Sequence, residues 1–327
     1  MTQKKMVKKL GLTFFFLALV LPLALASCAP EPEVTEVSTL RIGTFPIVDL
    51  APVYLGDELG YFEEEGITIE YVPQFGAQGI PVLEAGDMDI NASESIGTVQ
   101  AISQGFDITI VAGMTKGRTG APESATIMVL GDSGIAAPQD LVGKTMAIYA
   151  FESSSSLVAE AWLEKNGVDP SEVTFTELGF HLMPDALMNG QVDAIFDIEP
   201  FRTALLDTGQ VTALAYPDIE VHAGWDIAQF VAKADWVEAH PVATKKFATV
   251  VARTIDWINA NEAEARKMIA AYAQLDPAMA DAILLPVFSA QVSVDSMQDT
   301  AQLMSEHGML DTQVDIASHV YETALGD

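Results

Sequence analysis

The chain has 327 residues, half of them apolar, which is enough for two domains of ordinary size with large cores. Its formal net charge is −30, and four of its 16 Lys and Arg residues lie within the first nine positions, so the remainder is more acidic still. This charge repels nucleic acids and anionic lipid headgroups and argues against a phosphate-rich partner, although an adaptation for solubility would give the same composition.

The amino-terminal segment, residues 1–27, is typical of a secretory signal peptide. Four Lys residues precede an apolar stretch, 11–25, that is too short for a membrane-spanning helix with its own stop signal. The stretch ends in Leu-Ala-Ser-Cys, which resembles the bacterial lipobox, where Cys28 receives diacylglycerol and an acyl chain such as palmitate. An uncleaved anchor or an ordinary cleavage site is the alternative.

Cys28 is the only cysteine, so neither a disulfide framework nor thiol catalysis is expected. Residues 28–39 are rich in Pro, Glu and Thr, cannot bury apolar area, and predict an extended tether.

From residue 40 onward, short apolar strands alternate with helices that end at glycine. We expect strands at 40–45, 67–72, from 89, and 108–112, with helices at 51–59, 79–85 and 96–103 between them. This β-α alternation predicts a parallel sheet with helices on its faces.

After an expected strand at 126–130 the alternation begins again. The second set comprises strands within 141–151 and at 173–177, 193–196 and 211–215, with helices at 155–165, 183–188 and 201–207. A strand at 227–231 then leads into a helical region that includes 277–285 and 294–308.

The predicted fold class is therefore α/β with two lobes, each a parallel-rich sheet flanked by helices. Lobe 1 is expected to comprise residues 40–130 and 227–327, with the carboxyl-terminal helices packed on it, and lobe 2 residues 131–226. The chain would cross between the lobes twice, near 129–134 and near 221–226.

A short motif, Leu-x-x-Gly-x-x-Asp, occurs once in each predicted lobe. It comprises Leu83, Gly86 and Asp89 and then Leu187, Gly190 and Asp193, which are 104 residues apart. In both copies a helix would end at a glycine in the left-handed region, and a buried strand would follow the aspartate.

Ligands of open α/β sheets bind at the carboxyl ends of the strands, and a cleft between two such edges opens and closes about a hinge. The residues expected at those ends are Thr44, Phe45, Ser93, Glu94, Ser95, Ser153, Ser154, Ser155, Asp197 and Glu199. Helix capping is the alternative role for the serines and carboxylates. Phe45, Tyr149 and Trp225 are candidates to stack on a flat ligand, with a place in the core as their alternative.

Cationic residues are scarce near the predicted strand ends. Only Lys116, Arg118 and Arg202 lie there, and an anionic ligand would need at least one of them. A neutral ring rich in hydrogen-bond donors would instead meet Glu94, Asp197 or Glu199.

Several catalytic patterns are missing. The histidines at 181, 222, 240, 307 and 319 are scattered and have no cysteine partner, so no zinc site is expected. Gly-x-Ser-x-Gly and dinucleotide-binding glycine patterns are absent. Gly143-Lys144-Thr145 fails as a phosphate loop because Pro138 stands where the first glycine is required. No cofactor is expected.

Two motifs are specific in combination: Gly-Tyr-Phe-x-x-x-Gly at 60–66 and Asp-Ala-Ile-x-x-x-Glu-Pro at 193–200. With them, residues 40–325 resemble the substrate-binding proteins of ABC importers, in the group that contains the nitrate, sulfonate and taurine binders and the thiamine-pyrimidine and riboflavin binders. The resemblance implies a two-lobe Venus flytrap fold of the second periplasmic-binding type.

The resemblance also implies a ligand site at 44–45, 93–95, 153–155 and 197–199, a permease and its ATPase as partners, and a lipid-anchored position on the extracytoplasmic face of the cell membrane. The sulfonate and nitrate binders usually add a cationic contact, whereas the rim here is acidic. The vitamin binders combine aromatic stacking with carboxylates, which favours riboflavin first and the thiamine pyrimidine second. An organosulfonate or similar anion, or an enzyme of pyrimidine synthesis on the same scaffold, are the alternatives.

Overall fold

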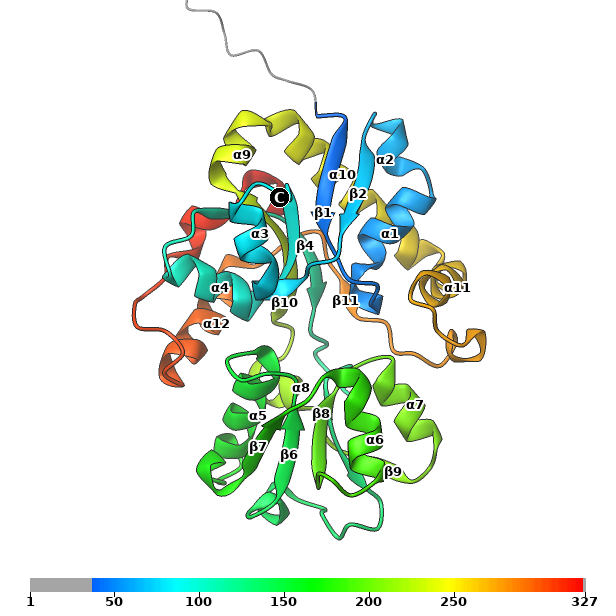
Figure 1. Ribbon diagram of the computed structural model, residues 1–327, viewed down its shortest axis with the longest axis vertical. Coiled ribbons are helices and arrows are strands. Elements are labelled where there is room, and N and C mark those ends of the chain that lie inside the picture. The colour runs from blue at the N-terminus through cyan, green and yellow to red at the C-terminus, as the bar shows by residue number, and fades with distance from the viewer. Residues whose placement is uncertain (1–36, 326–327) are drawn as a thin grey trace, which may run out of the picture. The chain divides into compact units, whose positions relative to one another are not determined.

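The computed structural model describes residues 37–325, and within this range the chain forms two separate β-sheets flanked by helices (Figure 1). The predicted signal peptide, Cys28 and most of the predicted tether lie outside the described residues.

The first sheet has the spatial order β11-β4-β10-β3-β1-β2. Its strands are β1 (Thr39–Gly43), β2 (Thr68–Val72), β3 (Ile90–Glu94), β4 (Ile108–Lys116), β10 (Asp226–Lys233) and β11 (Val287–Phe288). The second sheet has the order β7-β6-β8-β5-β9. Its strands are β5 (Thr126–Leu130), β6 (Thr145–Ile148), β7 (Thr174–Glu177), β8 (Ala194–Asp197) and β9 (Val211–Ala215).

Helices connect and cover both sheets. The α-helices are α1 (Ala51–Glu58), α2 (Tyr61–Glu64), α3 (Ile80–Glu84), α4 (Ser95–Ser103), α5 (Ser154–Lys165), α6 (Met183–Met188), α7 (Phe201–Asp207), α8 (Pro217–His222), α9 (Ala234–Ala239), α10 (Pro241–Ala260), α11 (Glu262–Tyr272) and α12 (Val294–Glu306). The 3-10 turns are η1 (Val48–Leu50), η2 (Gly76–Gly79), η3 (Pro138–Leu141), η4 (Pro170–Glu172), η5 (Phe180–Leu182), η6 (Pro277–Met279), η7 (Ile316–His319) and η8 (Glu322–Ala324).

The two sheets repeat one arrangement of strands. In the first, β1 lies between β2 and β3 and is parallel to both, and β10 runs antiparallel between β3 and β4. In the second, β6 is parallel to β7 and β8, and β5 runs antiparallel between β8 and β9. The two-lobe α/β fold is therefore as expected, but both sheets are mixed and each contains an antiparallel strand.

The antiparallel strands come directly after the two crossings of the chain. β5 belongs to the second sheet, so the chain leaves the first sheet between Lys116 and Thr126, earlier than the predicted 129–134. It returns between His222 and Asp226, within the predicted segment. The sequence placed 126–130 with the first lobe because an apolar strand carries no mark of which sheet it joins.

The repeated motif has the same structural role in both sheets. Asp89 accepts a hydrogen bond from the backbone N–H of Arg41 at 2.8 Å, and Asp193 accepts one from that of Thr145 at 2.9 Å. The backbone N–H of each aspartate donates back to the carbonyl of the same partner, at 2.9 Å in both cases. Each aspartate, one residue before its own strand, thus bonds to the parallel neighbour, at the middle residue of β1 in the first sheet and at the first residue of β6 in the second. We call this two-way contact the aspartate clasp.

The leucine and the glycine of the motif position the aspartate for this contact. Leu83 and Leu187 are fully buried, and Gly86 and Gly190 adopt φ values of 75° and 66° where their helices end. The left-handed glycine reverses the chain after the buried leucine and delivers the aspartate to the edge of the sheet.

Several elements differ from the sequence expectations. Residues 277–285 form only the short turn η6, and the carbonyls of Ala280 and Ile283 accept bonds from the Arg266 guanidinium at 3.2 and 2.7 Å rather than from a continuing helix. Helix α8 and the two-residue strand β11 were not expected from the sequence.

The carboxyl-terminal helices pack on the first sheet, as predicted. Side chains of α10 and α11, among them Phe247, Val251 and Ile269, share one apolar core with Ile42 of β1 and Phe230 of β10. Figure 1 shows α1 and α10 beside this sheet, and α12 contacts α4. Within 37–325, none of the helices combines the length and the apolar character needed to cross a bilayer.

We expect Asp89→Asn to reduce the free energy of unfolding by about 1–3 kcal/mol, because an amide leaves the bond from the Arg41 guanidinium without its charged acceptor. The matched variant Asp193→Asn should cost less, since that side chain is 39% exposed whereas Asp89 is 8% exposed. Urea denaturation of both variants measures the difference, and equal losses would contradict the argument.

Candidate functional site

The predicted rims of the two sheets meet at Glu94 and Ser154. Glu94 is the last residue of β3, and Ser154 is the first residue of α5 beyond β6. The Ser154 hydroxyl donates to Glu94 Oε2 at 3.4 Å, and nearby Gln100 donates to Glu152 at 3.3 Å. The carboxyl ends of one strand from each sheet therefore contribute polar groups to one place.

Most of the serines at the start of α5 form hydrogen bonds within the turn that begins this helix. Ser153 and Ser156 form a capping box at the start of α5. Ser155 accepts from the backbone N–H of Tyr149 at 3.0 Å and lies 2.8 Å from the Ser153 hydroxyl. Ser154 alone among the predicted serines 153–155 has its hydroxyl directed at the other sheet.

Ser93 and Ser95 are buried beside Glu94 and face the first sheet's interior. The Ser95 hydroxyl contacts the Asp226 carbonyl at 2.5 Å and Gln229 Oε1 at 2.9 Å, both on β10. Ser93 makes one long bond, 3.3 Å, to the Glu94 carbonyl. Because β3 runs without a loop into α4, these serines lock the position of Glu94.

The two predicted carboxylates after β8 differ in their surroundings. Glu199 accepts from the Arg202 guanidinium at 3.1 Å, from the Thr203 hydroxyl at 2.8 Å and from the backbone N–H of Leu284 at 3.2 Å. Glu199 therefore links helix α7 of the second lobe to the carboxyl-terminal segment. Asp197 is fully buried, and its Oδ2 has no hydrogen-bond partner among the described residues.

Four carboxylates lie close enough for their charges to interact around the meeting point of the rims. Glu94 interacts with Asp49 of η1 and with Asp218 of α8, and Glu123 of the first crossing interacts with Asp49 and Asp218. We call Asp49, Glu94, Glu123 and Asp218 the carboxylate cluster. The first sheet, a crossing and the second sheet each contribute to it.

The ionisation of three members of the cluster, Asp49, Glu94 and Asp218, is strongly perturbed. Burial raises the pKa of Glu94 to about 7, with a further contribution from the charge of Asp49. Burial likewise raises the pKa of Asp49 to about 6, and burial followed by the charges of Glu123 and Glu94 raises the pKa of Asp218 well above its ordinary value. Perturbed carboxylates of this kind gather at functional sites.

Thr115, at the end of β4, adds an unpaired hydroxyl to the cluster. It is 1% exposed, and its proximity favours the ionised form of Asp49, but it makes no hydrogen bond of normal geometry with a described residue. The same holds for Oδ1 of Asp218, which is 4% exposed. Buried polar atoms without partners are costly in a folded protein, so these two point to a ligand.

The three aromatic residues considered for stacking on a ligand have different surroundings. Phe45 is 55% exposed and Tyr149 stacks on Phe180 at 4.6 Å, whereas Trp225 is 2% exposed and packs in the core with its Nε1 unpaired.

A stack of three tyrosines also lies near the cluster. The ring of Tyr54 lies 4.8 Å from that of Tyr71 and 4.6 Å from that of Tyr272. The Tyr54 hydroxyl lies 3.0 Å from that of Thr44, and the charge of Asp49 contributes, after burial, to raising the pKa of Tyr272.

The three cations predicted near the strand ends all have other partners. Lys116 pairs with Asp226 at 3.5 Å, Arg202 pairs with Glu199, and Arg118 donates to the carbonyl of Leu285 at 3.2 Å. The described residues around the cluster therefore offer an anion little positive charge.

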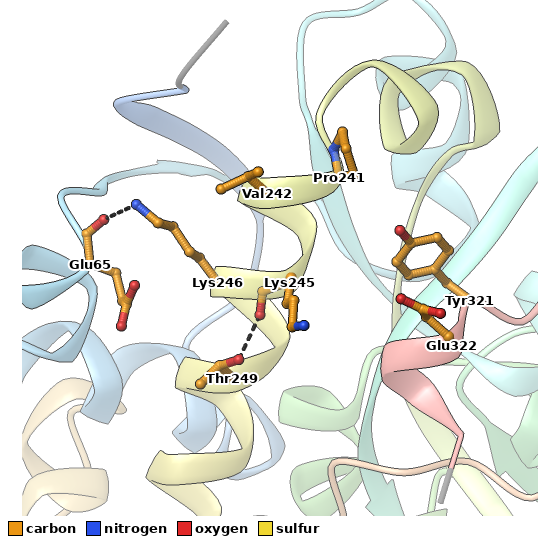
Figure 2. Close-up of a pocket in the computed structure, with 8 residues that line it drawn as sticks. All are labelled: Glu65, Pro241, Val242, Lys245, Lys246, Thr249, Tyr321 and Glu322. Carbon is orange, nitrogen blue, oxygen red and sulfur yellow. Dashed lines mark hydrogen bonds between the residues drawn. The ribbon is translucent and has the colours of Figure 1, made fainter. Parts of the chain in front are cut away.

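Two surface pockets lie away from the cluster. Figure 2 shows one of about 400 Å³ beside α10, lined by residues that include Lys245, Lys246 and Tyr321. The other, of about 570 Å³, is lined by Arg41, Asp89 and their neighbours at the opposite ends of the strands. Neither contains a predicted site residue. Across residues 37–325 there is also no group of His, Cys, Asp and Glu side chains arranged to hold a metal ion.

Sequence reasoning missed Asp49, Thr115, Glu123 and Asp218. Asp49 follows β1 closely and could have been found by extending the first rim by a few residues. Asp218 gave no signal because α8 was not expected, and Glu123 lies in a crossing that was placed too late in the chain.

Comparison with known proteins identifies the family. The profile of the NMT1/THI5-like family matches residues 47–265. The chain belongs to this family. A bicarbonate-binding protein from Synechococcus is 25% identical over 290 residues, with 79% of this chain and 62% of the relative covered. A formylaminopyrimidine-binding protein from Halalkalibacterium halodurans is 25% identical over 213 residues, covering 64% and 58%.

A synthase of 4-amino-5-hydroxymethyl-2-methylpyrimidine phosphate from Schizosaccharomyces pombe is also related, at 26% identity over 157 residues, 48% of this chain and 43% of the relative. The chain thus spans less than two thirds of the length of these curated relatives.

Solved structures establish the two-lobe periplasmic-binding fold of the second type. An alkanesulfonate-binding protein from Xanthomonas axonopodis superposes with a TM-score of 0.73 at 24% identity, covering 88% of this chain and 99% of that one. A nitrate-binding protein from Synechocystis gives 0.69 at 14% identity, covering 86% and 85%.

We expect Glu94→Gln to raise the free energy of unfolding by about 1–3 kcal/mol at about pH 8 and to change it little at about pH 5. The folded protein holds the Glu94 proton up to about pH 7, and the unfolded chain releases it near its ordinary pKa of 4.5, so native Glu94 loses stability as the pH rises through this window. Thermal melts at the two pH values measure the effect. Glu63→Gln, on the exposed part of α2, is the control and should show no such pH dependence.

Glu199→Ala should cost about 3–5 kcal/mol, because it leaves the buried Arg202 guanidinium without its partner. The double variant Glu199→Ala with Arg202→Met should recover most of this loss, since both charges are then removed. Denaturant unfolding of the two variants gives the comparison; a double variant as unstable as the single one would refute a pairing role.

Proposed function

We propose that the protein is the solute-binding component of an ABC importer and that it captures a small heteroaromatic vitamin precursor at the carboxylate cluster. The observation that carries the proposal is the contact between Glu94 and Ser154, which brings the strand ends of both sheets to one site. Family membership and the fold agree with it, because both include proteins named for the solutes they bind. Binding would involve no catalysis.

The chemistry of the cluster favours a ligand that donates hydrogen bonds. Its carboxylates are acceptors when ionised, and Thr115 adds a hydroxyl. An aminopyrimidine presents several N–H donors on a small flat ring, and one relative is named for binding such a compound. We therefore propose the thiamine pyrimidine ahead of riboflavin, the first choice from the resemblance, because the riboflavin ring offers fewer donors to a group of carboxylates.

Two other functions remain as alternatives. An anion such as a sulfonate or nitrate has support from the fold relatives, but Lys116 and Arg202 are already paired with carboxylates. An enzyme of pyrimidine synthesis has support from the related synthase. That activity would be detected as turnover of a bound candidate by mass spectrometry.

The proposal includes a location and partners. We infer that the protein is attached through a lipid on Cys28 to the extracytoplasmic face of the cell membrane, and that a permease with its ATPase receives the ligand. Metabolic labelling with palmitate, compared between the native protein and Cys28→Ala, tests the anchor.

Isothermal titration of the purified protein with 4-amino-5-hydroxymethyl-2-methylpyrimidine, riboflavin and methanesulfonate tests the ligand class. We expect the pyrimidine to bind most tightly and Glu94→Gln to weaken it by about tenfold, the equivalent of one charge-assisted hydrogen bond. Glu63→Gln should bind as the native protein does. Tighter binding of methanesulfonate, with Glu94→Gln strengthening it, would favour the anion alternative.

A further inference from the structure

The carboxylate cluster carries more negative charge than a neutral ligand needs. Asp49, Glu94, Glu123 and Asp218 act on one another electrostatically, while the nearby cations Lys116 and Arg202 are paired elsewhere. Like charges brought together without a counter-charge disfavour ionisation. The raised pKa values of Asp49, Glu94 and Asp218 favour protons on these three carboxyl groups in the protein alone.

The members of the cluster differ in how many of their carboxylate oxygens already accept hydrogen bonds. Glu123 accepts from the backbone N–H groups of Arg118 and Ser124 at 2.5 and 2.6 Å, so both of its oxygens are used. Glu94 has only the long contact to Ser154, and Asp218 Oδ1 has no partner among the described residues. Glu94 and Asp218 are therefore the members with acceptor capacity left for a ligand, and Asp49 supplies further charge.

Thr115 gives an independent indication that something binds here. It is not acidic, it is 1% exposed, and its hydroxyl lies beside Asp49 without a hydrogen bond of normal geometry. A hydroxyl can accept an N–H bond while the carboxylates next to it accept others. The combination suits a group with several N–H donors and a positive charge.

We propose that the site selects ligands with a protonated amine, whose ammonium group is held by Glu94 and Asp218 with Thr115, in the negative field of Asp49, in preference to neutral or anionic ligands of the same size. This proposal rests on the proposed function and specifies the charge of the ligand. Binding of the cation ionises the carboxyl groups that are protonated in the free protein, and their protons leave to solvent.

Two probes that differ in one group test the preference. They are 4-amino-5-aminomethyl-2-methylpyrimidine, with a protonated amine, and 4-amino-5-hydroxymethyl-2-methylpyrimidine, with a neutral hydroxyl in its place. At about pH 8 we expect the amine to bind at least about tenfold more tightly, as a charged donor exceeds a neutral one. At about pH 5 the preference should shrink to within about threefold, because Glu94 and Asp49 then carry protons.

Two variants connect the preference to the cluster. Glu94→Gln should abolish most of the difference between the probes at about pH 8, and Asp49→Asn should reduce it in the same direction, which keeps the test valid if one variant fails to fold. Glu63→Gln is the matched control and should retain the full preference. Calorimetry of the amine in two buffers of different ionisation enthalpy at about pH 6.5 should reveal proton release.

The outcomes separate this inference from the proposed function. Equal affinity for the two probes, or a preference that Glu94→Gln leaves intact, overturns the ammonium site but leaves a pyrimidine-binding protein. Binding of nitrate or methanesulfonate in place of both probes overturns the cation preference and supports the anion alternative. If the folded protein binds none of these solutes, the proposed function fails as well.

Discussion

The two-way contact between an aspartate and the neighbouring parallel strand is the constraint on which both sheets depend. Parallel strands are not joined by a tight turn, so their relative register has to be set by something other than the connection. Asp89 and Asp193 set it directly before β3 and β8, each through a side-chain and a backbone bond to one residue of the parallel neighbour. Once the strands are aligned at these points, their carboxyl ends are aligned too, and these ends carry Glu94 and Asp197.

The same geometry explains why the site is acidic yet buried. Glu94 is fixed by a strand that passes directly into α4, with Ser95 bonded to β10 on one side. It has little freedom to turn toward water. The protein therefore maintains a carboxylate whose ionisation is unfavourable without a ligand, and retaining such a group is characteristic of binding and catalytic sites, where stability is given up for function.

Much of the fold follows from local patterns in the sequence. Glycine-terminated helices and short apolar strands predicted nearly all elements, and the repeat at Leu83 and Leu187 indicated two related halves. The pairing of the strands was less accessible: β5 and β10 look like any other apolar strand, and only their partners across the chain reveal that they run antiparallel. The predicted helix 277–285 is only a short turn, and the carbonyls after it bond to the Arg266 side chain, a contact that no local pattern indicates.

The site was predictable only where it lies at strand ends. Glu94 and Ser154 come directly after apolar runs, and the sequence places them on facing rims. Glu199 has the same position but bonds to Arg202 and to the backbone of Leu284, contacts that no sequence pattern indicates. Asp218 and Thr115 enter the site through an unexpected helix and an extended strand, and their importance is visible only from burial and missing partners.

Because β5 and β10 each follow a crossing between the sheets, the order of the strands along the chain also sets the order in which the two sheets can form during synthesis. When β4 has been made, its neighbour β10 does not yet exist, and β1, β2 and β3 cannot reach it. The five strands of the second sheet are contiguous in the chain and can assemble before residue 226 is reached. The first sheet therefore remains incompletely paired until β10, which is encoded more than a hundred codons after β4, has been synthesised.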